Sequence, residues 1–166
     1  MRASAGLILI CLAAGCRTRP PGAPAGGAVP AADSIVLERT RCFGTCPAYR
    51  LSLARSGVVR FHSRNPGDEA REASGTVSPG AFEGLVQQAA RLGFWSLPDQ
   101  IAGSALCERQ ATDHPTATVT LFGRRGAKRV EDYLGCFDAP QELRRFETAI
   151  DSVAGSRQWV RPSAIR

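Results

Sequence analysis

The sequence predicts an α+β fold: a two-layer sandwich with an antiparallel sheet of two hairpin units, each followed by a helix. Two observations carry this prediction. Short segments in which apolar and polar residues alternate, as in half-buried strands, occur in two groups along the chain. Each group is followed by a segment whose apolar residues recur with helical spacing. This order of strands, helix, strands, helix favours an antiparallel sheet over a parallel one.

The first group of strands opens with an apolar segment at Ile35. Further on, Tyr49, Leu51 and Leu53 alternate with polar neighbours, and the turn at 55–57 sends the chain back into a second alternating segment. The predicted elements of this half are strands at 35–37, 49–54 and 58–62, a polar loop at 63–74 and a short strand near Thr76.

The first helix is predicted to begin at Pro79 and to stop at Gly93. Ser78 can cap its first turn, and Pro79 at the first helical position loses no hydrogen bond. Gly93 permits the backbone conformation that commonly ends a helix. The stripe expected to face the sheet consists of Phe82, Leu85, Val86 and Ala89.

The second half repeats this plan. Residues 116–121 alternate, the tip at 123–126 reverses the chain, and residues 128–133 return. Asp138 is predicted to cap the next helix, with Gln141 three residues on. The predicted buried stripe of this helix is Leu143, Phe146, Ile150 and Val153, with Gly155 as its stop.

The N-terminus has the layout of a secretory signal. A positive residue, Arg2, precedes an apolar run, and small residues lead to Cys16. Residues 12–16 resemble the lipid-acceptor site of bacterial lipoproteins, which implies cleavage after Gly15 and acylation of Cys16. The apolar run is shorter than the roughly 20 residues that cross a bilayer, so a permanent span is not expected. An ordinary cleaved signal without lipid is the alternative.

These signals divide the chain into four parts. Residues 1–15 are the predicted signal peptide, and residues 16–33 are a tether rich in Pro, Gly and Ala, without apolar periodicity. Residues 34–160 are one α+β domain, large enough for one hydrophobic core, and residues 161–166 are a tail. Arg17 follows the predicted lipid-acceptor cysteine, and the resemblance to sorted lipoproteins implies that Asp at this position would mean retention in the inner membrane. The favoured location is therefore the bacterial envelope, lipid-anchored to the outer membrane and facing the periplasm.

The chain is basic, with a formal charge of +6. A basic protein can bind nucleic acid, but these arginines are scattered and an exported protein rarely meets that partner, so nucleic-acid binding is not expected. The densest positive group brackets the predicted hairpin tip, where solvated charge is ordinary and contact with phosphate-rich lipid head groups is the alternative. This group is Arg124, Arg125, Lys128 and Arg129.

The predicted domain contains four cysteines, and in an oxidising compartment an even number indicates disulfides. Of the three possible pairings, closeness in sequence favours Cys42 with Cys46 and Cys107 with Cys136. A reactive dithiol at Cys42 and Cys46 is one alternative, although such pairs usually have two intervening residues and precede a helix. Zinc is another, because thiolates at this spacing fall within ligand range. No metal or other cofactor is expected.

A possible polar site consists of Asp113, Asp132 and Tyr133, if the second hairpin brings them together. His62 and His114 are isolated in the sequence and are expected at a strand end and in a turn. The chain contains no Gly-rich phosphate loop, nucleophile elbow or metalloprotease helix motif. We therefore predict no catalytic residue and favour a non-enzymatic role.

The most specific local pattern lies at residues 41–49, which include Cys-Phe-Gly-Thr-Cys-Pro-Ala-Tyr. With residues 112–115, 131–133 and 155–159, it resembles a bacterial family known as domain of unknown function 6438. The resemblance spans residues 34–160. It implies an exported, lipoprotein-like chain and brings no established activity, ligand or catalytic residue.

Two hypotheses about function follow. The first is a non-enzymatic envelope lipoprotein whose disulfide-stabilised domain binds an envelope protein or a cell-wall partner, or supports an assembly. The second is an envelope thiol-redox or metal-handling protein that uses Cys42 and Cys46. Bonded, buried sulfurs would favour the first hypothesis, and exposed, reactive sulfurs the second.

Overall fold

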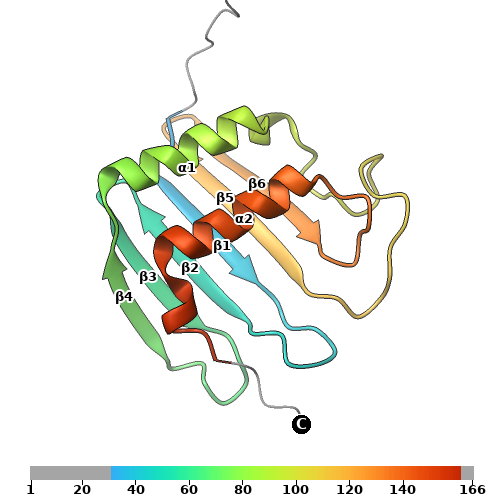
Figure 1. Cartoon of the computed structure of the whole chain (residues 1–166), viewed down its shortest axis with the longest axis horizontal. Helices are drawn as coiled ribbons and strands as arrows, with labels where there is room; N and C mark the ends of the chain where they lie inside the picture. Colours follow the sequence, from blue (N-terminus) through green and yellow to red (C-terminus); the bar gives the residue numbers. More distant parts are fainter. Residues whose placement is uncertain (1–30, 162–166) are drawn as a thin grey trace, which may run out of the picture.

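The computed structural model describes residues 31–161 of the chain (Figure 1). It has a mixed α+β fold in which a six-stranded antiparallel sheet is accompanied by two α-helices. The strands are β1 (Ser34–Arg39), β2 (Tyr49–Ala54), β3 (Val58–Ser63), β4 (Glu72–Thr76), β5 (Thr116–Gly123) and β6 (Gly126–Tyr133), and the helices are α1 (Pro79–Arg91) and α2 (Gln141–Ala154).

The strands form one sheet in the order β4-β3-β2-β1-β5-β6. The first four follow one another as a meander, and β5 and β6 then add to the free side of β1. The hairpin predicted at 49–62 is thus the centre of a four-stranded meander, with the strand predicted at 35–37 on one side of it and the strand predicted near Thr76 on the other. The expected short strand near Thr76 is present, and pairing with β3 begins at Glu72, so the polar loop before it is shorter than predicted.

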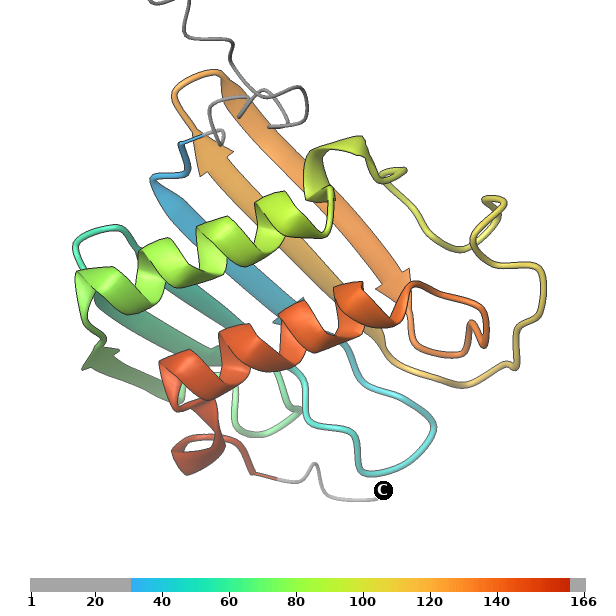
Figure 2. The ribbon, with the colours of Figure 1, turned by 45° about the horizontal axis from the view of Figure 1, so that its top comes forward.

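Both helices lie against the same face of the sheet in two views (Figures 1 and 2). Helix α1 begins as predicted, because the Ser78 hydroxyl accepts a hydrogen bond from the Ala81 N–H at 3.1 Å and Pro79 opens the first turn. Gly93 follows the helix with a φ of +72°, a conformation that favours glycine. None of the helices within residues 31–161 is long and apolar enough to cross a membrane.

The hydrophobic core lies between the helices and the sheet face that they cover. Alternate residues of each strand point to this face, so cross-strand partners form rows, such as the one that joins Leu51, Leu37 and Val119. All four residues of the stripe predicted for α1 are buried. The largest fully buried side chains include Phe82, Phe94, Phe146, Ile35, Leu37 and Leu51.

Helix α2 differs in two ways from the prediction. It begins at Gln141 after Pro140, and Asp138 does not cap it. Asp138 instead accepts hydrogen bonds from the backbone N–H and the guanidinium of Arg109, and these bonds lower the pKa of Asp138. The buried residues of α2 are Leu143, Phe146, Glu147, Ile150 and Ala154, whereas Val153 is half-buried.

Candidate functional site

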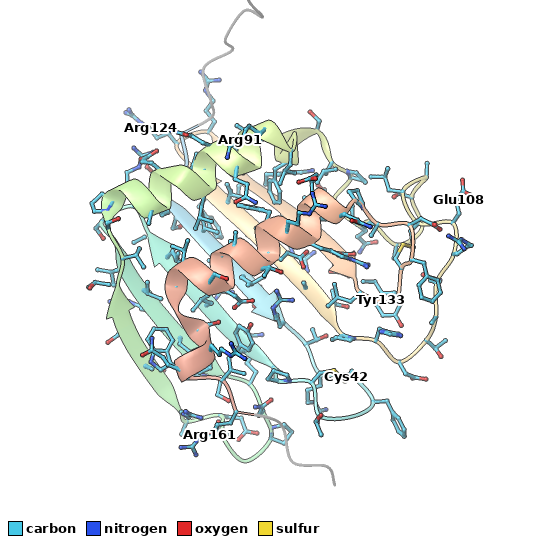
Figure 3. All side chains as sticks on the ribbon, viewed as in Figure 1. Cys42, Arg91, Glu108, Arg124, Tyr133 and Arg161 are labelled. Atoms are coloured by element: carbon cyan, nitrogen blue, oxygen red, sulfur yellow. A yellow bond between two sulfur atoms is a disulfide. The ribbon has the colours of Figure 1, made fainter. Side chains whose placement is uncertain are left out.

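The connection between β1 and β2, residues 40–48, is the candidate site, and we call it the disulfide loop. The strand residues at which the loop begins and ends, Arg39 of β1 and Tyr49 of β2, lie directly opposite each other in the sheet. Within the loop a disulfide joins Cys42 to Cys46, with an S–S distance of 1.98 Å and a Cα–Cα distance of 5.5 Å. The bond closes a short covalent ring at one end of the sheet, opposite Arg124 of the β5–β6 hairpin tip (Figure 3).

Phe43 protrudes from this ring with 92% of its surface exposed. Its backbone is nevertheless held, because the Phe43 N–H donates to the carbonyl of Asp113 at 3.2 Å. Beside the ring, the Thr40 N–H donates to the Thr116 carbonyl at 3.0 Å, and the Thr116 N–H donates to the Thr40 hydroxyl at 2.8 Å. The loop therefore displays an apolar side chain on a fixed backbone.

A single carboxylate of α2 holds both ends of the disulfide loop. Asp151 accepts a hydrogen bond from Nε of Arg39 at 3.0 Å, and a second guanidinium nitrogen lies 2.9 Å from the same oxygen. Its other oxygen accepts hydrogen bonds from the hydroxyls of Tyr49 and Ser156, each at 2.7 Å. Burial, together with the charge of Asp151, raises the pKa of Tyr49, so the phenol stays protonated as a donor.

The same row of the sheet leads to a second ion pair. Arg39 faces Ala117 on β5, and Ala117 faces Asp132 on β6. Asp132 is fully buried and accepts a hydrogen bond at 3.0 Å from Arg144 of α2, which also donates to the Cys136 carbonyl at 2.5 Å. Because Ala117 carries only a methyl group, the longer charged side chains on either side have room beneath α2.

Glu147 completes this arrangement from α2, and it is only 2% exposed. A guanidinium nitrogen of Arg39 lies 3.9 Å from its carboxylate. One oxygen of Glu147 and one of Asp132 are buried without a hydrogen-bond partner among the described residues. Burial, with the negative charge of Asp132, raises the pKa of Glu147 to about 8. Burial also raises the pKa of Asp132, against the opposing effect of Arg144.

These side chains form one unit that supports the disulfide loop. Two of its acids, Asp132 and Glu147, are buried, whereas the side chain of Asp151 keeps 20% of its surface exposed. Its bonds to the loop ends fix the loop on the sheet, and the exposed part of the site offers a contact surface. We call this unit the α2 network, and it consists of Arg39, Tyr49, Asp132, Arg144, Glu147 and Asp151.

A family model described as Domain of unknown function (DUF6438) matches residues 33–154. The chain belongs to this family. The disulfide loop and the whole α2 network lie within the matched residues of this chain. A search of the curated proteins found no match to the chain.

Both disulfides favoured by closeness in sequence are present in the DUF6438 domain. The second joins Cys107 to Cys136, with sulfurs 2.17 Å apart, and closes a much longer loop than the first. Loop closure gives about 3.5 kcal/mol for the long loop and about 2 kcal/mol for the short ring. Sulfurs bonded to each other offer no thiolate to a metal, and in residues 31–161 no three His, Cys, Asp or Glu side chains are grouped to hold one. Cys16 lies outside the described residues.

The polar site predicted from Asp113, Asp132 and Tyr133 does not assemble. The Tyr133 hydroxyl donates to the Ala111 carbonyl at 2.8 Å and accepts from the His114 N–H at 3.2 Å, so it organises the loop that contacts the disulfide loop. Asp113 is exposed in that loop, with a φ of +67°. Consecutive strand residues point to opposite faces, which places the Asp132 carboxylate beneath α2, away from Tyr133.

We did not predict from the sequence that Arg39, Glu147 and Asp151 are partners, although a signal for each was present. Arg39 continues the alternation of β1 two residues after Leu37, so its side chain points to the same covered face. Glu147 and Asp151 follow Leu143 at helical spacing on the buried side of α2. Charged residues at inward positions of both a strand and a helix indicate a buried ion pair.

Proposed function

We propose that this DUF6438 protein is a bacterial envelope lipoprotein whose domain binds a partner through the disulfide loop. The proposed lipid on Cys16 and the tether at 16–33 would hold the domain at the outer membrane, facing the periplasm. Two disulfides in one small domain support an oxidising compartment. In the proposed two-layer sandwich, the helices occupy one face of the sheet and leave the loops at its ends for contact.

The exposure of Phe43 carries the proposal. The apolar surface of this side chain is removed from water only when a partner covers it. Burial of one aromatic ring in an interface stabilises a complex substantially. Because the disulfide closes the ring and Asp151 fixes both loop ends, little conformational entropy remains to be lost on binding. A preformed apolar projection of this kind suits a protein or cell-wall partner with a complementary pocket.

The position of the disulfide loop supports an anchored binding protein. The chain enters β1 at Ser34 and reaches the loop after Arg39, so a strand of about 20 Å separates the two. Cys42 and Arg124 lie at opposite ends of the sheet (Figure 3). A domain tethered through residues 16–33 can therefore present the disulfide loop away from its membrane.

The binding role is tested by placing a photoreactive phenylalanine analogue at position 43 in intact bacteria that produce the protein. We expect one discrete cross-linked partner, and Phe43→Ala should weaken its association more than tenfold, as for an aromatic hot spot. The matched control is position 137, because Phe137 is also exposed, at 63%, and lies outside the disulfide loop. Equal cross-linking at both positions, or none at position 43, would contradict a role for the loop.

The anchor is tested separately by labelling cells with a fatty acid. The native protein should carry the label and begin at Cys16, and Cys16→Ser should abolish both labelling and lipoprotein-type cleavage. Ser34→Ala, at the first residue of the domain, is the control and should leave labelling unchanged. An unlabelled native protein, or one that begins at another residue, would refute the lipoprotein assignment while leaving the cross-linking test standing.

A further inference from the structure

The sheet face opposite the helices carries a hollow of about 440 Å³. It lies over β2, β3 and β4, and its polar lining comes from the strand positions that alternate with the core residues. Cross-strand pairing sets these side chains in two adjacent rows, with neighbouring Cβ atoms about 5 Å apart. The rows are Arg50, His62 and Glu72, and next to them Ser52, Arg60 and Ser74.

Arg60 stands at the middle of the second row with its guanidinium free. Its direct neighbours across the strands are Ser52 and Ser74, whose side chains are short and uncharged. Within residues 31–161, neither the Arg60 guanidinium nor the two serine hydroxyls have a hydrogen-bond or ion-pair partner. Three residues that line the hollow therefore carry side-chain donors without an acceptor: one guanidinium, which has five N–H groups, and two hydroxyls.

The acidic residues around the hollow do not compensate this charge. Arg50 and Arg64 both bind the same oxygen of Glu38, at 2.9 and 3.0 Å, so two guanidinium groups share one carboxylate. Glu72 lies 3.1 Å from Nδ1 of His62. The hollow thus keeps a surplus of positive charge around Arg60, and a ligand that fits it carries negative charge and several hydrogen-bond acceptors.

We propose that this hollow binds a phosphate monoester, with Arg60 as its central cation. The three terminal oxygens of such a group match donors that approach from three neighbouring strands, and guanidinium binds phosphate through two parallel hydrogen bonds. A carboxylate has only two oxygens in one plane and would leave part of this donor set unused. The site lies on the other side of the sheet from the helices and does not depend on the disulfide loop or on the lipid anchor.

Titration of the purified protein with phenyl phosphate tests the proposal, with amide chemical shifts and calorimetry as readouts. Ionic strength is held constant with chloride so that general screening does not change. We expect shifts confined to β2, β3 and β4, and at least tenfold weaker binding in Arg60→Gln. Arg91→Gln is the matched control, because Arg91 is an exposed arginine of α1 without a partner among the described residues. This variant should bind phenyl phosphate as tightly as the unmodified protein.

A second variant keeps the test independent of any folding defect in Arg60→Gln. Ser74→Asp sets a carboxylate opposite Arg60 and should abolish phosphate binding while the unfolding temperature stays unchanged. The proposal is overturned if phenyl phosphate causes no shifts on these strands, if either hollow variant binds as tightly as the unmodified protein, or if Arg91→Gln loses as much affinity as Arg60→Gln.

Vesicles of phosphatidylcholine with phosphatidic acid distinguish the source of the phosphate, because phosphatidic acid presents a monoester at a lipid surface. If the unmodified protein is retained on these vesicles and Arg60→Gln is not, the ligand is a lipid head group. Binding of phenyl phosphate without such retention assigns it to a soluble ester. The absence of both responses overturns the site.

Discussion

Helices α1 and α2 pack on the same face of the sheet, but they meet it with different chemistry. The buried side chains of α1, among them Phe82 and Leu85, are all apolar. Helix α2 buries Phe146 and Ile150 in the same manner, and it also buries the carboxyl group of Glu147. Helix α1 therefore contributes only apolar side chains to the core, whereas α2 contributes both apolar side chains and charged groups of the α2 network.

The sheet beneath the helices explains this difference. The rows near the start of β1 are apolar, as where Ile35 pairs with Leu53 and Leu121, whereas the last row contains Arg39 and Tyr49. Buried charges contribute less stability than apolar packing because desolvation opposes them. Their hydrogen bonds are directional, however, and here they fix the ends of the disulfide loop. Helix α1 therefore mainly stabilises the domain, whereas α2 also positions its candidate binding surface.

The largest expected effects come from paired substitutions, one on each helix. Phe82→Ala should lower the free energy of unfolding by about 3 to 5 kcal/mol, through lost burial and the cavity left behind. Asp151→Ala should cost about 2 kcal/mol, because it removes a charged acceptor shared by Arg39 and Tyr49 in a partly buried place. Urea unfolding measures both values.

Amide hydrogen exchange separates the two roles. In Asp151→Ala, the amides of Phe43 and Thr116 should exchange faster than the loss of global stability requires, whereas in Phe82→Ala all protected amides should change together. Ser152→Ala is the matched control, since Ser152 is exposed on α2 and its hydroxyl donates only to the Thr148 carbonyl. If Asp151→Ala leaves the exchange of the disulfide loop in step with the whole domain, α2 does not position the loop.

Much of the fold was predictable because it depends on local patterns. A few neighbouring residues determine each of three features: the alternation along β2, the start of α1 at Ser78-Pro79 and the end of α2 at Gly155. The strand at Glu72–Thr76 was harder to predict, because its residues are mostly small or polar and it exists through its pairing with β3. Its length therefore depends on a neighbour and not on its own sequence.

The candidate site was predictable only in part. The cysteine spacing predicted the Cys42–Cys46 ring, since the partners are close in sequence. The α2 network was not predicted, because Arg39 and Asp151 are joined across more than a hundred residues. Asp138 was expected to cap α2, but its carboxylate instead accepts a hydrogen bond from the guanidinium of Arg109. Interactions of this kind require the tertiary arrangement of strands and helix.

A last expected effect is a pH dependence of stability that α2 brings and α1 does not. Glu147 has a pKa of about 8 in the folded domain, well above its ordinary value, so the folded state holds this proton more tightly than the unfolded chain does. The stability from this group is therefore complete below about pH 4.5 and is lost as the pH rises through about 8. The raised pKa of Asp132 acts in the same direction.

Glu147→Gln tests this effect, because glutamine resembles the protonated acid in shape and carries no charge at any pH. Thermal unfolding at pH 5.5 and pH 8.5 should show a fall in midpoint for the unmodified protein and a smaller fall for Glu147→Gln, with the residual fall due to Asp132. Glu142→Gln is the control, since Glu142 is exposed on the same helix and pairs only with Arg145, and it should keep the full pH dependence. An equal fall in Glu147→Gln and the unmodified protein would show that the buried carboxyl of α2 does not set the pH response. The roles of the two helices would then differ only in that α2 positions the disulfide loop.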